Sequence, residues 1–127
     1  MQLKIEETNI TESITRMLIE LGIPAHLRGY YYLRDAVEMT MKDLELVGSV
    51  TKLLYPQIGK KYKCTSQRVE RAIRNSIEVS WERGNPQLME NLFGYSKEDG
   101  KRRPTNSEYI VALADKLRRE LQLNSTR

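Results

Sequence analysis

The sequence predicts an all-α fold, a single domain of about six helices that contains a helix-turn-helix. Apolar residues recur every three or four positions along most of the chain, and no segment alternates between apolar and polar residues over the length of a strand. Capping residues, glycines and prolines divide this pattern into separate segments. At 127 residues the chain has the size of one domain with a modest core.

A first helix is predicted to begin near Asn9 and to end at Gly22. Asn9 can cap its start, and Glu12 can reach back to the same turn in a capping-box arrangement. Gly22 is suited to end it, because glycine readily adopts the left-handed conformation that often follows a helix. Residues 1–8 show no stable periodicity and are interpreted as a linker or leader, so the folded domain is expected to cover residues 9–123.

A second helix is predicted over about residues 25–43. Gly29 lies in its first turns, where glycine costs about 1 kcal/mol relative to alanine, so we expect a close contact with another helix there. The cluster Tyr30, Tyr31 and Tyr32 follows. Aromatic residues beside arginines can stack on nucleic-acid bases, but the helical spacing of this cluster favours core packing.

The central part of the chain predicts two helices joined by a tight turn. Apolar residues recur at helical spacing over residues 50–62, although Pro56 requires that this helix either starts late or bends. Thr65 and Ser66 are good N-cap residues for a second helix, which ends near Gly84, where a positive φ is expected. Two helices linked by so few residues have the outline of a helix-turn-helix.

The second helix of this pair is amphipathic. Its apolar face is predicted to contain Val69, Ala72, Ile73, Ser76, Ile77 and Ser80, and its polar face Gln67, Glu70, Arg71, Arg74 and Glu78. Between residues 60 and 83 there are seven basic and three acidic residues, a surplus that equals the formal net charge of +4 of the whole chain. A surplus confined to one helix pair indicates a polyanionic partner such as DNA, although a solvated helix face is the simpler alternative.

Two further helices are predicted near the C-terminus. Asn85 is suited to cap a short helix that stops at Gly94. Thr105 and Glu108 form a second capping box at the start of a longer, final helix. Residues 124–127 are expected to fray.

The stretch between these two helices, YSKEDGKRRP, is predicted to be a polar loop. It carries the basic run Lys101, Arg102 and Arg103. This run either contacts phosphates or is only a solvated loop, and the sequence leaves both interpretations open.

Several classes of protein are not supported by the sequence. It contains no Gly-rich phosphate loop, nucleophile arrangement or metal-ligand cluster, so we expect no enzyme activity, cofactor or metal site. The only cysteine, Cys64, cannot form an internal disulfide, which suits a reducing compartment. No apolar run is long enough to span a membrane and no signal peptide is evident, so a cytoplasmic location is expected.

Four runs of residues carry a resemblance to a known family. They are GSVTKLLYPQIGKKYKCTSQRVERAIRNSIEVSWERGN, the preceding GIPAHLRGYYYLRDAV, and the following LFGY and RPTNSEYIVALADKLR. Together they resemble the DNA-binding effector domains of the stage-zero sporulation protein A family, which controls entry into sporulation. Members of that family begin with a phosphorylatable receiver domain. No such pattern occurs in this sequence, so a receiver domain is either removed or naturally absent.

The resemblance implies that the second helix of the pair enters the major groove at boxes of the TGTCGAA type, with Glu70, Arg71 and Arg74 reading bases. The chemistry agrees, because arginine donates two hydrogen bonds to guanine and a carboxylate accepts one from cytosine. The alternative is that Glu70 and Arg74 only pair with each other on a solvated face. Other DNA contacts are expected from Lys60, Lys61, Lys63, Thr65, Ser66, Gln67, Arg68 and Asn75.

The resemblance also implies protein partners. Residues 84–97 match a region implicated in contacting the primary sigma factor of RNA polymerase, and two domains are expected to bind adjacent boxes in tandem. The residues expected to contact the sigma factor are Asn85, Gln87, Glu90, Phe93, Tyr95 and Lys97. An alternative function is a small helical interaction module that binds RNA polymerase or another regulator with reduced DNA affinity. The intact set of Glu70, Arg71 and Arg74 favours DNA binding over this alternative.

Overall fold

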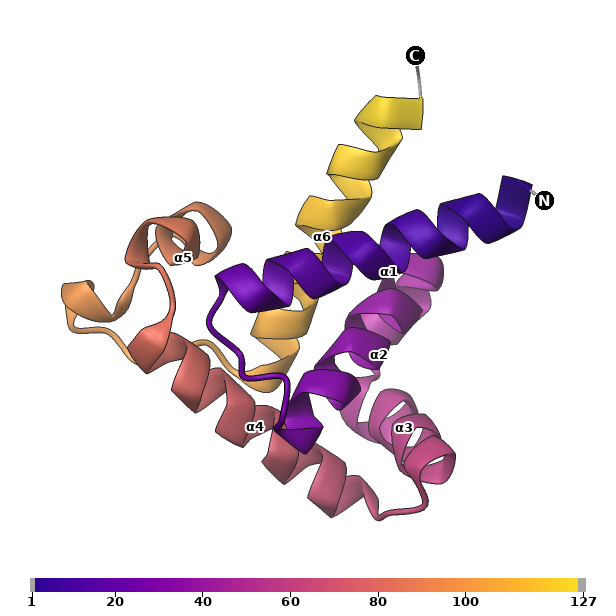
Figure 1. Cartoon of the computed structure of the whole chain (residues 1–127). Coiled ribbons are helices and arrows are strands. Elements are labelled where there is room, and N and C mark those ends of the chain that lie inside the picture. The colour runs from indigo at the N-terminus through magenta and orange to yellow at the C-terminus, as the bar shows by residue number, and fades with distance from the viewer. Residues whose placement is uncertain (1, 126–127) are drawn as a thin grey trace.

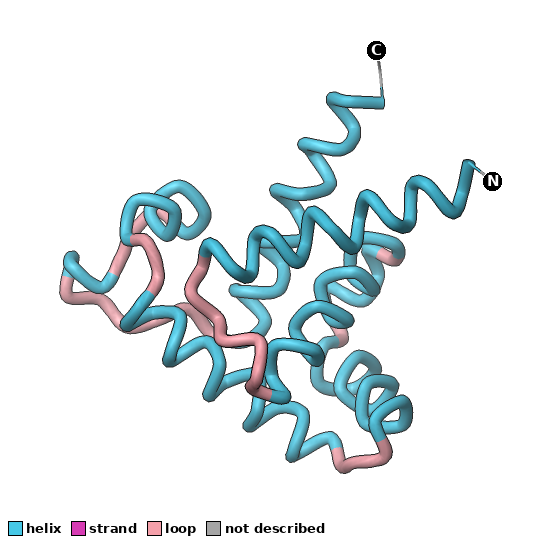
Figure 2. Tube along the Cα trace, viewed as in Figure 1, coloured by secondary structure: helices cyan, strands magenta, loops and turns pink. Residues whose placement is uncertain are grey.

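The computed structural model describes residues 2–125. Within this range the chain forms six α-helices and no strand, and Figure 2 shows the loops that connect the helices. The α-helices are α1 (Gln2–Glu20), α2 (Arg28–Lys42), α3 (Tyr55–Tyr62), α4 (Ser66–Arg83), α5 (Pro86–Phe93) and α6 (Asn106–Ser125). Shorter helical turns cover Leu44–Gly48, Val50–Leu54 and Lys97–Asp99. The prediction of a single all-α domain of about six helices is confirmed.

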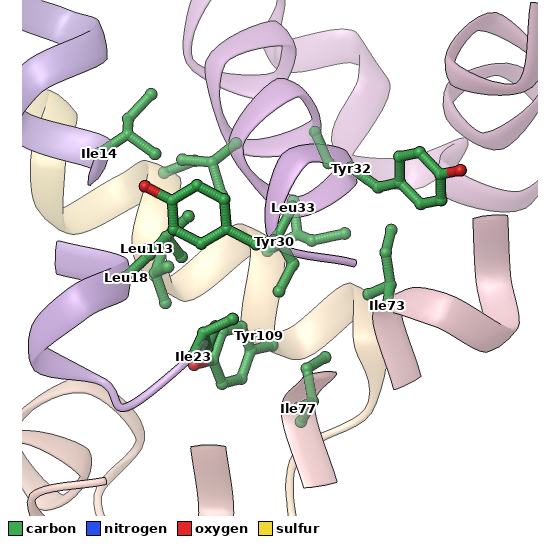
Figure 3. Packing of buried hydrophobic residues seen from close by; sticks show 14 of the residues in the cluster. Ile14, Leu18, Ile23, Tyr30, Tyr32, Leu33, Ile73, Ile77, Tyr109 and Leu113 are labelled. Carbon is green, nitrogen blue, oxygen red and sulfur yellow. The ribbon is translucent and has the colours of Figure 1, made fainter. Parts of the chain in front are cut away.

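Helix α2 is at the centre of the packing. It contacts α1, α4 and α6, and α4 also contacts α3 and α6. Figure 1 shows α4 lying along one edge of the molecule, with α3 beside its N-terminal end and α5 beside its C-terminal end. In the core, Leu33 of α2 lies among Ile14 of α1, Ile73 of α4 and Leu113 of α6, and all four side chains are fully buried (Figure 3). The core therefore holds α4 from one side only.

Helix α1 begins earlier than the sequence pattern predicts. It starts at Gln2, so residues 2–8 are helical instead of forming a linker, and Asn9 lies inside the helix instead of capping it. The reason is local, since residues 2–7 are mostly good helix formers that continue the helix past a possible cap. The predicted end is confirmed, because Gly22 adopts a φ of 78°.

Helix α2 is slightly shorter than the predicted residues 25–43, and two predictions about its packing are confirmed. Gly29 makes a close contact with α4, since a Cβ atom at this position would overlap the side chain of Ser76 and the backbone of Ala72. Tyr30 and Tyr32 are buried in the core, as their helical spacing indicates. Tyr31, in contrast, is 41% exposed.

The effect of Pro56 is resolved by a change of helix type. Residues Val50–Leu54 form a turn of π-helix, and the α-helix α3 begins only at Tyr55. Pro56 therefore lies in the first turn of α3, the part of an α-helix that tolerates proline because its N–H groups make no i→i−4 bond within that helix. Of the two alternatives left open by the sequence, a late start is the one observed.

Helix α4 ends just before Gly84 as predicted, but glycine is needed there for a different reason from the positive φ that was expected. The φ of Gly84 is −74°, so the position does not use the left-handed freedom of glycine. Glycine is required instead by close packing, because a Cβ atom would contact the backbone oxygen of Leu21 and come within 2.6 Å of the Met89 side chain. At the other end of the chain, α6 extends to Ser125, two residues into the stretch expected to fray. Residues 126–127 lie outside the described residues.

A buried hydrogen bond links α4 to α6. The hydroxyl groups of Ser80 and Tyr109 lie 2.8 Å apart, and both side chains are fully buried. Burial raises the pKa of the Tyr109 hydroxyl well above its usual value, so this group stays protonated at physiological pH. The bond satisfies two polar groups that water does not reach.

We expect Tyr109→Phe to lower the free energy of unfolding by about 1–3 kcal/mol, because it leaves the buried Ser80 hydroxyl without this partner. In the double variant Ser80→Ala with Tyr109→Phe both polar groups are gone, so its cost should be smaller than the sum of the two single costs. Urea unfolding of the wild type and the three variants measures this coupling. Strictly additive costs would contradict a shared hydrogen bond.

Candidate nucleic-acid interface

The inner face of α4 fixes this helix to the core as predicted. Val69, Ile73, Ser76, Ile77 and Ser80 are buried, and Ala72 is partly buried against the core cluster. The turn before Gly84 adds Trp81, which is also buried. Packing along the whole helix gives its outer side chains a defined position relative to the rest of the domain.

The outer face of α4 carries the polar residues that the sequence predicts. Glu70 is partly exposed. The other residues of α4 after Ser66 that were predicted to form its polar face or to contact DNA are exposed: Gln67, Arg68, Arg71, Arg74, Asn75 and Glu78. Glu70 and Arg74 form an ion pair with 2.9 Å between Oε2 and Nη1, the i,i+4 pairing considered from the sequence. Among residues 9–121, no hydrogen bond or ion pair occupies Arg71. Its guanidinium group is therefore available to a ligand.

The turn before α4 places further predicted residues near its N-terminal end. Lys63 has a left-handed conformation with φ 58°, which reverses the chain between α3 and α4. Thr65 Oγ1 accepts a hydrogen bond from the backbone N–H of Arg68 at 3.1 Å and so caps α4, as predicted. Lys60 is exposed on α3, and Ser66 is partly buried at the first position of α4.

Lys61 differs from the other predicted basic contacts because it already has an acidic partner. Its Nζ lies 2.9 Å from Asp35 Oδ2 of α2, and the Tyr62 hydroxyl donates to the same oxygen at 2.7 Å. Burial first, and then the Asp35 carboxylate, raise the pKa of Tyr62 to about 12, so Tyr62 remains a donor. This cluster ties α3 to α2. Its one signal in the sequence is an aspartate on the buried side of an amphipathic helix.

Asn106 is a second residue whose role the sequence pattern does not predict. It is the first residue of α6, and its Nδ2 donates to the Tyr55 hydroxyl at 3.0 Å and to the backbone oxygen of Glu70 at 3.1 Å. One side chain therefore joins α6 to both α3 and α4. The available signal was the PTNSE run, which carries the resemblance but suggests only a helix cap.

The comparison with protein families decides the identity of this domain. The model of the family described as sporulation initiation factor Spo0A C terminal matches residues 14–117. The chain belongs to this family. The Spo0A C-terminal family comprises DNA-binding regulatory domains of sporulation, so the resemblance found in the sequence is confirmed. The matched range contains α2, α3, α4 and α5 completely.

The predicted sigma-factor region lies around α5, at the end of α4 opposite to the turn between α3 and α4 (Figure 1). Several of its residues have structural partners. Asn85 caps α5 by accepting from the Gln87 N–H at 2.9 Å, and Lys97 donates to the backbone oxygen of Glu82 at 2.7 Å. The ring of Phe93 packs on Tyr109 and that of Tyr95 on Trp81. Gln87 and Glu90 are the members with exposed side chains on α5.

A membrane-spanning helix has to be both long and apolar. Within residues 2–125, no helix combines the length and the apolar character needed to cross a bilayer.

Proposed function

We propose that the chain is a sequence-specific transcription regulator of sporulation initiation that reads TGTCGAA-like boxes with α4, the second helix of a helix-turn-helix formed by α3 and α4. One observation carries this proposal. The unoccupied guanidinium of Arg71 projects beside the paired Glu70 and Arg74 on a helix whose opposite face is buried. Membership of a DNA-binding family supports it.

The chemistry of base readout fits these three residues. The Arg71 guanidinium can donate two parallel hydrogen bonds to O6 and N7 of guanine. Glu70 can accept from cytosine N4, and its ion pair with Arg74 holds both side chains in a defined orientation before DNA arrives. Such a set suits a box that contains adjacent G·C pairs.

The remaining predicted contacts supply affinity without sequence information. Lys60 and Lys63 are exposed beside the turn and can neutralise phosphates. Thr65 accepts the cap hydrogen bond through its oxygen, so its hydroxyl hydrogen is still able to donate to a phosphate. Lys61 would have to share its charge with Asp35, so we assign it a weaker contact.

The test compares binding of the wild type and Arg71→Ala to a duplex with the TGTCGAA box and to a scrambled duplex by fluorescence anisotropy. We expect the wild type to prefer the box and Arg71→Ala to bind it roughly 5–150-fold more weakly, the equivalent of about 1–3 kcal/mol for one bidentate contact. Binding to the scrambled duplex should change much less.

The matched control is Arg119→Ala on α6. Arg119 is 67% exposed and pairs with Asp115 on its own helix, so its removal changes the net charge equally without touching α4. Its box preference should equal that of the wild type. Equal binding of both duplexes by the wild type would mean that the protein binds DNA through attraction to phosphates and does not read the base sequence. Absence of binding to either would favour the interaction module.

Two further parts of the proposal concern assembly. We propose that α5, through its exposed Gln87 and Glu90, contacts the primary sigma factor of RNA polymerase, and that two chains occupy adjacent boxes in tandem. The family resemblance supports both parts, and the exposure of Gln87 and Glu90 supports the first. Analytical ultracentrifugation with a tandem-box duplex tests the second part, and a single chain per duplex at saturation would overturn it.

A further inference from the structure

A groove beside the outer face of α4 brings distant parts of the chain together. It has a volume of about 400 Å³ and lies between the start of α3, the middle of α4 and the segment that leads into α6. Its lining residues are Thr51, Tyr55, Glu70, Arg74, Arg102, Arg103, Pro104, Thr105, Asn106 and Ser107. Three of the charged residues in this lining are arginines and one is an acid. The lining is therefore rich in arginine, and Glu78 and Glu108, the acids that pair with Arg103 and Arg102, lie outside it.

The segment with these arginines is held against α4 at two points. Arg103 Nη2 lies 3.0 Å from Glu78 Oε2, one turn after Arg74 on the outer face of α4. Three residues later, Asn106 donates to the backbone oxygen of Glu70. Because both attachments are made to α4 itself, the residues between and beside them keep a fixed position relative to the proposed base-reading residues.

Of the two arginines that this segment contributes to the groove lining, Arg102 is the less firmly held within the protein. Its side chain is 70% exposed, and its one carboxylate neighbour, Glu108 Oε1, lies 3.7 Å away on a side chain that is itself 56% exposed. An exposed pair at this distance contributes little and is readily given up. Arg102 Nη1 also donates to the backbone oxygen of Arg103 at 3.0 Å, which orients the guanidinium while leaving most of its five N–H donors free.

We propose that Arg102 binds a backbone phosphate of the same DNA duplex whose major groove α4 enters. The inference rests on the proposed function of α4. An α-helix with its side chains is about 10–12 Å wide and the major groove is about 12 Å wide, so groups packed beside the helix meet the phosphate backbones that border the groove. Arg102 lines a groove together with Glu70 and Arg74, so it occupies such a flanking position.

This contact extends the DNA-binding surface beyond the helix pair. The loop with Arg102 lies more than twenty residues from the middle of α4 in the sequence. The acids Glu98 and Asp99 lie close to its basic residues in the sequence, so the loop does not stand out as a basic segment. In the fold, Glu70 is neutralised by Arg74 and Glu78 by Arg103. Arg102 also faces a carboxylate, that of Glu108, but this pair is the longest and the most exposed of the three, so Arg102 is the cation on this flank that a phosphate can most easily recruit.

The experiment measures the dependence of duplex binding on salt for the wild type, Arg102→Ala, Arg102→Lys and Arg119→Ala. Arg119 is the matched control because it has a similar exposure and lies about 20 Å along α6 from Asn106 at 1.5 Å per residue. Loss of one phosphate contact should lower the slope of log K against log salt by about 0.9, and the affinity at about 0.1 M salt by roughly fivefold to tenfold. The loss should be equal for the box and the scrambled duplex.

The other variants separate this contact from general effects. Arg102→Lys keeps the charge and should retain most of the slope, whereas Arg119→Ala should leave slope and affinity within about twofold of the wild type. If Arg102→Ala and Arg119→Ala gave the same slope while the wild type still preferred the box, this inference alone would be overturned. If the wild type bound neither duplex, the proposed function would fall together with it.

Discussion

Replacing Gly29 with alanine is expected to lower the free energy of unfolding by about 3 kcal/mol or more, since severe overpacking exceeds the usual cost of 1–3 kcal/mol. A Cβ atom here would overlap the Ser76 hydroxyl and the Ala72 backbone oxygen, and would lie 2.9 Å from the Ala72 carbonyl carbon. A backbone group cannot turn aside, so α2 and α4 must separate. The gain in helix propensity, about 1 kcal/mol, is too small to compensate.

Gly48→Ala is the matched control for this substitution. A Cβ atom at Gly48 would meet no other atom within 4 Å, and its φ is not positive, so alanine should change stability by less than about 1 kcal/mol. Urea unfolding followed by circular dichroism compares the two variants. Adding Ser76→Ala to Gly29→Ala should recover only part of the loss, because the Ala72 carbonyl remains in place. Similar unfolding midpoints for Gly29→Ala and Gly48→Ala would contradict the close contact.

Truncation of Ile73 to alanine is expected to cost about 2–5 kcal/mol, the range for deleting a large buried aliphatic side chain. Ile73 is fully buried on the inner face of α4, among the core residues shown in Figure 3. Ile19→Ala makes the same chemical change on α1, where the side chain is 63% exposed, and should cost less than about 0.5 kcal/mol. Urea unfolding of the two variants checks the difference, and equal costs would mean that α4 is not held by this core.

The Ile73 variant also separates folding from DNA recognition. Ile73 faces the core and Arg71 faces solvent on the same helix. Under conditions in which Ile73→Ala remains folded, its preference for the box over the scrambled duplex should equal that of the wild type. Arg71→Ala should show the opposite combination, with normal stability and a reduced preference. Loss of preference in both variants would show that small shifts of α4 disturb readout.

The sequence by itself determined the features that depend on neighbouring residues. Helical periodicity and the caps at Thr65 and Asn85 located α4 and α5 because a cap is satisfied within its own turn. The same periodicity separated the buried face of α4 from its polar face and predicted the pair of Glu70 with Arg74, which are one turn apart. The local pattern was wrong at the start of α1, where helix propensity outweighed a possible cap at Asn9, and at Tyr31 of α2, which is exposed although its cluster was expected to pack in the core.

Only the tertiary structure decided which distant residues meet. The bond from Asn106 to Glu70 joins positions 36 residues apart, and the cluster of Asp35 with Tyr62 joins positions 27 apart. Likewise, the packing of Gly84 and the place of Arg102 beside α4 depend on how helices cross. Local patterns fix each helix and its faces, but hydrophobic burial and steric fit between helices select the crossings, and these place Arg102 beside the helix that carries Arg71.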